Sequence, residues 1–203
     1  MKQILLAGIL GGLTLFVWTF VAHQFLGLGE TGVGEIPNEA VVVSAMRGAI
    51  PDAGFYIFPG LGLGPNPTSE QRKAAMQETM KKYEQSPHGV LVYHPASGPF
   101  NFGATLGRQF ALNVLQALLA AWLVSCAASG RGYSTRVGIV VVAGVVAAIS
   151  TNVEYWNWYA FPGNYTAGYM TTQIVGFVLA GFVIAALAKN GTAAARMTND
   201  VDT

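Results

Sequence analysis

The sequence predicts an all-α membrane protein with four transmembrane helices and a small extracytoplasmic α+β insertion between the first and second helices. Only 10% of the 203 residues are charged and 52% are hydrophobic, whereas about 25% of the residues of a soluble domain are charged. The charges are also unevenly spread, because four long runs carry none. Runs of this length and composition are typical of helices that cross a bilayer.

The composition predicts that the protein interacts with the lipid bilayer and gives no indication that it binds nucleic acid. The formal net charge is +1, so the chain lacks the excess of basic residues that is typical of proteins that bind DNA or RNA. Cys126 is the only cysteine, and this excludes an intrachain disulfide and a cysteine-based zinc site. The sequence has no GxSxG, P-loop or CxxC motif, so we predict no catalytic residue and no cofactor.

The first transmembrane segment is assigned to residues 1–28. Residues 4–22 carry no charge, and this length approaches the ~20 residues that a spanning helix needs. A cleaved signal peptide is the alternative, but Phe20 stands where cleavage would require a small residue. Gly8 and Gly12 have the spacing of a close-packing helix face. His23 marks the far end of this segment.

Residues 29–105 differ in composition and predict a small water-facing domain. They hold five basic and seven acidic residues and many prolines and glycines. Thr68 with Gln71 fits a capping box at the start of a helix. Met76, Met80 and Tyr83 form an apolar stripe that we expect to pack on the local strands. The expected elements are a helix at 38–48, a strand at 54–58, a helix at 69–85 and a strand at 89–93.

The remaining spans lie within residues 106–188. Uncharged runs place them at 109–130, 137–153 and 167–188. Small residues recur at four-residue spacing in the second and fourth spans and predict close helix contacts there. These stripes consist of Ala117, Ala121 and Ser125, and of Gly168, Thr172, Gly176 and Ala180. The polar tail, residues 189–203, is expected to be cytoplasmic and disordered.

Charge asymmetry predicts a multi-pass topology with both termini in the cytoplasm. Basic residues then fall in all three cytoplasmic segments, and the short loop between the third and fourth spans carries none. The basic residues in question are Lys2, Arg131, Arg136, Lys189 and Arg196. An aromatic belt at the outer membrane boundary is assigned to Trp18, Trp156, Trp158 and Tyr159.

A polar cluster is predicted at the outer boundary. Arg136 and Glu154 are 18 residues apart, a helical rise of about 27 Å, which nearly matches the ~30 Å hydrocarbon core. If Arg136 lies at the inner boundary, Glu154 lies at the outer one. His23 and Arg108 reach the same level from the first and second spans, and His94 of the insertion is a fourth candidate.

Two interpretations of this cluster remain open. It could bind a solute or handle protons, since ionisable residues in a span are functional candidates. It could also be structural, with Glu154 paired to Arg108 and fastening the helix ends, which is favoured because a charge at the boundary is readily solvated. His23, His94 and Glu154 have ligand types suited to zinc but no tight spacing signature, so no metal site is predicted.

Several segments are distinctive when taken together. They are the glycine-rich first span ending near Trp18 and His23, Pro37-Asn38-Glu39, Gly54-Phe55-Tyr56-Ile57-Phe58-Pro59-Gly60, Val92-Tyr93-His94-Pro95 and Tyr155-Trp156-Asn157-Trp158-Tyr159-Ala160-Phe161-Pro162-Gly163. With these segments the chain resembles, over most of its length, a family of small bacterial membrane proteins known only as conserved hypothetical proteins. The resemblance implies a bacterial cell-envelope setting, which with the predicted topology means an inner membrane and a periplasmic domain, and it brings no assigned activity.

The function that we expect is a non-enzymatic envelope accessory protein whose extracytoplasmic domain meets a protein partner. One alternative is a small-solute or proton-coupled carrier that uses the cluster of Glu154, His23 and Arg108. The other is a membrane enzyme or metal-binding protein. A water-lined cavity that reaches Glu154 would favour the carrier, and a dry, fully paired Glu154 would favour the structural interpretation.

Overall fold

The computed structural model describes residues 1–128 and 130–188, so the tail expected at 189–203 lies outside the described residues. The chain divides into two compact units. One is a helical bundle formed by residues 1–34 and by the described residues between 100 and 188. The other comprises residues 35–99. The second unit is therefore shorter at both ends than the predicted 29–105, because residues 29–34 belong to the bundle and the second span begins before 105.

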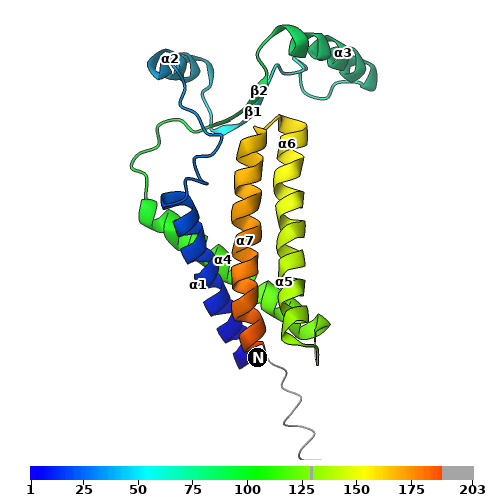
Figure 1. Ribbon diagram of the computed structural model, residues 1–203. Coiled ribbons are helices and arrows are strands. Elements are labelled where there is room, and N and C mark those ends of the chain that lie inside the picture. The colour runs from blue at the N-terminus through cyan, green and yellow to red at the C-terminus, as the bar shows by residue number, and fades with distance from the viewer. Residues whose placement is uncertain (129, 189–203) are drawn as a thin grey trace, which may run out of the picture. The chain divides into compact units, whose positions relative to one another are not determined.

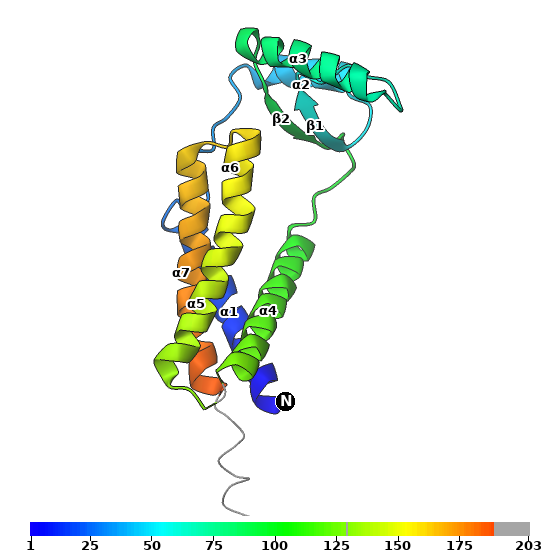
Figure 2. The same ribbon diagram turned by 90° about the vertical axis from the view of Figure 1, so that its right-hand side faces the viewer.

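The bundle contains four helical segments that are long and apolar enough to span a membrane, as the sequence predicts. They alternate in direction (Figures 1 and 2), with α1 packed against both α4 and α7, and α5 packed against α7. The chain is thus a multi-pass membrane protein. The segments are α1 (Lys2–Gln24), α4 (Phe102–Ala127), α5 (Tyr133–Ala148) continued by a π-helical turn η1 (Ile149–Val153) and α6 (Glu154–Tyr159), and α7 (Gly163–Leu187).

Three of these segments extend beyond their predicted bounds, and α7 does so by beginning at Gly163, four residues before 167. Helix α4 begins seven residues before 109, because the Asn101 side chain accepts a hydrogen bond from the Ala104 amide (2.9 Å) and caps the helix there. The third segment continues without a break to Tyr159. Glu154 therefore lies within this segment and not at its end.

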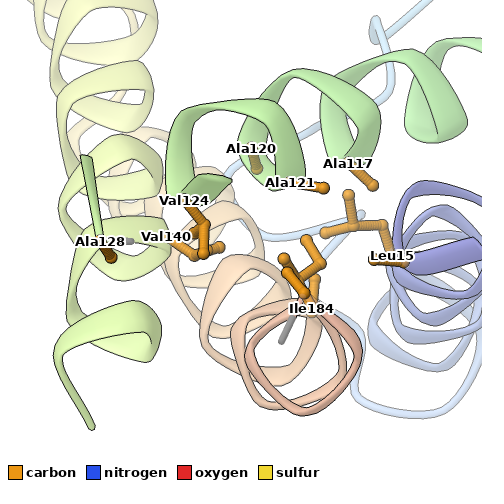
Figure 3. Packing of buried hydrophobic residues seen from close by; sticks show 11 residues of the cluster. Leu15, Ala117, Ala120, Ala121, Val124, Ala128, Val140 and Ile184 are labelled. Atoms are coloured by element: carbon orange, nitrogen blue, oxygen red, sulfur yellow. The ribbon is translucent and has the colours of Figure 1, made fainter. Parts of the chain in front are cut away.

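One half of the bundle is a dry, closely packed core. We call this the basal half; it contains the start of α1 and the end of α7, and the opposite half is the distal half. The core consists mainly of alanine, valine and leucine or isoleucine side chains that meet between the four helices (Figure 3). Its labelled members are Leu15, Ala117, Ala120, Ala121, Val124, Ala128, Val140 and Ile184.

Glycines bring the helices of the basal half together, which confirms the predicted close-packing face of α1. A Cβ on Gly12 would lie 2.5 Å from the Val114 Cα of α4, and a Cβ on Gly8 would collide with Leu118. The predicted stripe of α7 is also buried along its whole length. Within it, Gly176 gives Leu15 and Trp18 room to contact the α7 backbone.

The second unit contains the four predicted elements in the predicted order. Strands β1 and β2 pair antiparallel, with Gly54 opposite Tyr93 and Phe58 opposite Gly89. The capping box of α3 is confirmed, since Thr68 and Gln71 exchange hydrogen bonds of 2.8 and 3.1 Å. The elements are α2 (Glu39–Ala49), β1 (Gly54–Phe58), α3 (Ser69–Gln85) and β2 (Gly89–Tyr93).

The apolar stripe of α3 does not pack on the strands in the way that its periodicity predicts. Met76 and Met80 are 53% and 60% exposed. Together with Tyr83 they form one wall of an open groove of about 750 Å³, opposite the glycine- and proline-rich loop that follows β1. The reason is that the sheet has only two strands, which offer too little surface to cover a helix of 17 residues.

Candidate functional site

Polar side chains gather in the distal half of the bundle around a cavity of about 330 Å³, which we call the polar cavity. It lies between α1, α4 and α7, on the distal side of the dry core. None of the residues that line it is an Asp, Glu, Lys or Arg. The lining consists of Leu15, Trp18, Thr19, His23, Gln109, Asn113, Gln116, Tyr169, Thr172, Gln173, Gly176 and Phe177.

Asn113 is the residue of this lining that has a buried polar side-chain atom without a hydrogen-bond partner among the described residues. It is only 4% exposed, and its Oδ1 accepts a hydrogen bond of 3.0 Å from Gln109 Nε2. Its Nδ2 is buried and has no partner among the described residues. A buried donor without an acceptor costs about 1–3 kcal/mol. Asn113 therefore lines the cavity while its Nδ2 stays buried without a partner among the described residues.

Whereas Asn113 has an unpaired donor, His23 contributes a hydrogen-bond acceptor. Its Nδ1 lies 2.9 Å from the Thr19 carbonyl oxygen. A carbonyl only accepts, so Nδ1 carries the hydrogen and, in the neutral ring, Nε2 is an acceptor. The loop after α1 closes against this ring, because a Cβ on Gly29 would collide with it.

Trp18 joins α1 to α7 at the cavity. Its indole Nε1 donates to the Thr172 carbonyl of α7 (2.8 Å), and its ring packs against the backbone of Gly176, where there is no side chain. Trp18, Thr172 and Gly176 all line the polar cavity. The predicted belt residue Trp18 thus faces the interior of the bundle, whereas Trp156 and Trp158 are 51% and 77% exposed, and Tyr159 is half-buried.

The π-helical turn η1 turns one further amide toward the bundle interior. Asn152 is 7% exposed. Its Nδ2 donates to the Ala148 carbonyl of its own helix (2.9 Å) and to Gln173 Oε1 of α7 (2.6 Å). A π turn adds a residue to one helical turn and is often found at functional sites. Here the Asn152 side chain of η1 joins the third segment to α7 through its hydrogen bond to Gln173, which lines the polar cavity.

A second cavity, which we call the aromatic cavity, lies next to the first and measures about 280 Å³. The two cavities share Tyr169 and Gln173. Four aromatic rings from α6, the following turn and α7 contribute to the lining of the second one. Its lining consists of Thr151, Asn152, Tyr155, Phe161, Tyr165, Thr166, Tyr169 and Gln173.

The four residues of the predicted polar cluster lie in different surroundings in the structure. Of these, His23 lines the polar cavity. Arg108 is exposed, and its Nη2 donates to Thr105 Oγ1 on the same helix (3.2 Å). Glu154 is exposed at the start of α6. His94 is exposed and belongs to the second unit. Within the described residues, no group of three or more His, Cys, Asp or Glu side chains could hold a metal ion.

The residues that sequence reasoning missed are amides. Asn113, Gln109 and Gln116 lie in the second uncharged run, Asn152 in the third and Gln173 in the fourth. A search for ionisable residues passes over them because they carry no charge. The signal that could have found them is the cost of placing any hydrogen-bonding amide within an apolar segment without a partner.

Comparison of the chain with protein-family models, with curated proteins and with solved structures finds no match.

Proposed function

We propose that this multi-pass protein binds a small polar solute in the polar cavity and belongs to the carrier class of membrane proteins. The observation that carries the proposal is the unpartnered Nδ2 of Asn113, buried in the lining of the cavity. A ligand with an acceptor group would satisfy this donor, and the Nε2 of His23 would accept from a donor on the ligand. The cavity volume falls at the lower end of the range for ligand pockets.

The charge and packing of the site narrow the ligand class. The lining holds amides, hydroxyls, an imidazole and an indole, but no permanently charged side chain. Recognition would therefore act through hydrogen bonds, and an uncharged solute would enter at the lowest desolvation cost. The basal core is closed by contacting alanines and glycines. This asymmetry supports access from the distal end, as in one state of an alternating-access carrier.

The substitution Asn113→Leu tests this proposal. Leucine has a similar size but offers no donor, so we expect at least a tenfold loss of solute binding or flux. We expect the midpoint of thermal unfolding to stay equal or rise, because the replacement removes an unpaired buried donor worth about 1–3 kcal/mol. Flux is measured by stopped-flow light scattering of proteoliposomes with glycerol and urea as probes, and stability by thermal unfolding of the purified protein.

The threonine pair of α7 supplies the matched control. Thr172 lines the polar cavity and Thr171 is exposed, yet each donates to the carbonyl four residues earlier. We expect Thr172→Val to reduce glycerol or urea flux and Thr171→Val to leave it unchanged. A loss of stability in Asn113→Leu with unaltered flux would assign the amide to packing and reject the carrier.

The orientation that we propose places both termini in the cytoplasm, the distal end outside, and the second unit in the periplasm of a bacterial inner membrane. Support comes from the basic residues of the segments between spans and from the family resemblance described above. Fusion of alkaline phosphatase or of a fluorescent protein to the C-terminus tests the orientation. Fluorescence without phosphatase activity is expected, and an active phosphatase would reverse the assignment.

The second candidate function is an accessory protein that holds a partner through its second unit. The observation that favours it is the open groove beside Met76, Met80 and Tyr83. Methionines adapt to varied apolar surfaces, and an apolar peptide segment of another membrane protein is the occupant that we propose. A photocrosslinker at residue 80 should then capture one defined protein in native membranes, whereas the same group at Lys73 should not. Equal labelling from both positions would reject this role.

A further inference from the structure

We propose that the aromatic cavity binds a trimethylammonium group. This goes beyond the solute site proposed above, because it concerns a separate cavity with a different lining. The ligand class is that of choline and related quaternary ammonium compounds, either as free solutes or as the headgroup of a lipid.

Four rings form a continuous aromatic wall. Tyr155 and Phe161 stack with their ring centroids 5.5 Å apart. Phe161 and Tyr165 are 5.4 Å apart, and Tyr165 and Tyr169 are 4.4 Å apart. All four line the same cavity of about 280 Å³. The lining thus brings four aromatic rings to one cavity, and an aromatic ring carries a negative face and a positive edge.

Several polar groups of the cavity are already paired within the protein. Asn152 Nδ2 donates to Gln173 Oε1 (2.6 Å). The hydroxyls of Thr151 and Thr166 donate to carbonyls of their own chain segments at 3.0 and 3.1 Å. In the polar cavity, by contrast, the buried Nδ2 of Asn113 has no partner among the described residues. The lining of the aromatic cavity is mainly aromatic, so its rings are the main groups for recognising a ligand.

A trimethylammonium group fits these conditions. It is a cation without an N–H, so it needs no hydrogen-bond acceptor, and it is attracted by the faces of aromatic rings. A primary ammonium carries three N–H donors that each need an acceptor, and a mainly aromatic lining is less suited to supply them. None of the lining residues is basic, and the carboxylate of Glu154 stands next in sequence to Tyr155, so the local charges favour a cation.

The place of the cavity along the helices agrees with this ligand. The third segment has 27 residues, which gives a length of about 40 Å, whereas the hydrocarbon core is ~30 Å thick. The cavity lies beside the distal end of this segment, and its lining residues fall between Thr151 and Gln173. Lipid headgroups and dissolved quaternary ammonium compounds can both reach this level.

A comparison of two isosteres on the wild-type protein tests the inference. Choline and 3,3-dimethyl-1-butanol have the same shape, but only choline is charged. We expect choline to bind the purified full-length protein in detergent about tenfold or more tightly than the alcohol, as cation–π attraction in a partly dry site predicts. Calorimetry measures both affinities. Equal affinities, or no binding of choline, would overturn the proposal.

Ring substitutions locate the binding. Tyr165→Leu should weaken choline binding at least tenfold, and Tyr165→Phe should stay within about threefold of wild type because it keeps the aromatic face. Trp158→Leu is the matched control, since Trp158 is 77% exposed and lies outside the cavity lining. Should Tyr165→Leu not fold, the phenylalanine variant and the isostere comparison still decide. Unchanged binding in Tyr165→Leu would reject the aromatic site.

Nanodiscs of defined lipid distinguish the two sources of the group. If the ligand is a lipid headgroup, phosphatidylcholine should compete with choline and phosphatidylethanolamine should not. If the ligand is a free solute, the affinity for choline should be equal in both lipids. Glycerol and urea report on the polar cavity and choline on the aromatic cavity, so the failure of one proposal is separable from the failure of the other.

Discussion

Replacement of Gly12 by alanine is expected to destabilise the bundle by about 3 kcal/mol, at the upper end of the range for overpacked sites. The added Cβ would lie 2.5 Å from the Val114 Cα and 2.7 Å from its Cγ2. The first of these atoms belongs to the backbone of α4, so no rotamer change can relieve the collision, and the two helices must separate. Thermal unfolding of the purified protein, followed by circular dichroism, measures the effect.

Gly107→Ala is the matched control for this substitution. Gly107 lies on α4, the helix that Gly12 contacts, and a Cβ there would meet nothing within 4 Å. Alanine is favoured over glycine within a helix by about 1 kcal/mol, so we expect an unchanged or higher unfolding midpoint. If Gly12→Ala and Gly107→Ala behave alike, the close contact of α1 with α4 does not determine the stability of the bundle.

The second large effect is expected at the hydrogen bond between Asn152 and Gln173. Asn152→Leu removes the bond that joins η1 to α7 (2.6 Å) and leaves the Gln173 side chain without this partner in the bundle interior. We expect a loss of about 1–3 kcal/mol. Asn157→Leu, the same change at an exposed position five residues later, should have little effect.

A double-mutant cycle separates the bond from the packing of the two side chains. Asn152→Leu, Gln173→Leu and the double variant are compared by thermal unfolding, and we expect a coupling energy of about 0.6–1.7 kcal/mol, as for hydrogen bonds between transmembrane helices. A coupling near zero would mean that the contact between the two amides does not hold η1 against α7.

The elements were predictable because each follows from a local or one-dimensional pattern. Apolar runs without charge gave the four spans, and glycine spacing indicated how α1 packs against α4. The two strands and α3 were bounded by proline and glycine and by a capping box that involves only Thr68 and Gln71. These signals do not depend on distant parts of the chain.

The site was less predictable because it depends on which way side chains face. Trp18 carries the signature of an interfacial aromatic residue, but a glycine on another helix, Gly176, gives it room to turn inward. Asn152 faces the bundle because η1 shifts its position around the helix by a π turn that no periodicity in the sequence reveals. His23 was identified, whereas its partners in the cavity were not.

The stripe of Met76, Met80 and Tyr83 shows the limit of periodicity as evidence for burial. Helical spacing of apolar residues indicates that they share one face, and it does not show that another element covers that face. In the second unit no third strand and no second long helix are present among the described residues to do so. The result is a groove and not a core.

The division of the bundle into a dry basal half and a polar distal half has a consequence for how the protein can evolve. Stability depends largely on basal positions such as Gly12, where even one additional methyl group is excluded. The distal cavities are lined instead by side chains that already leave space around them. If the distal cavities bind ligands as we propose, lineages of this protein could exchange those ligands by substitutions in the distal half, while the basal half keeps the helices assembled through each change.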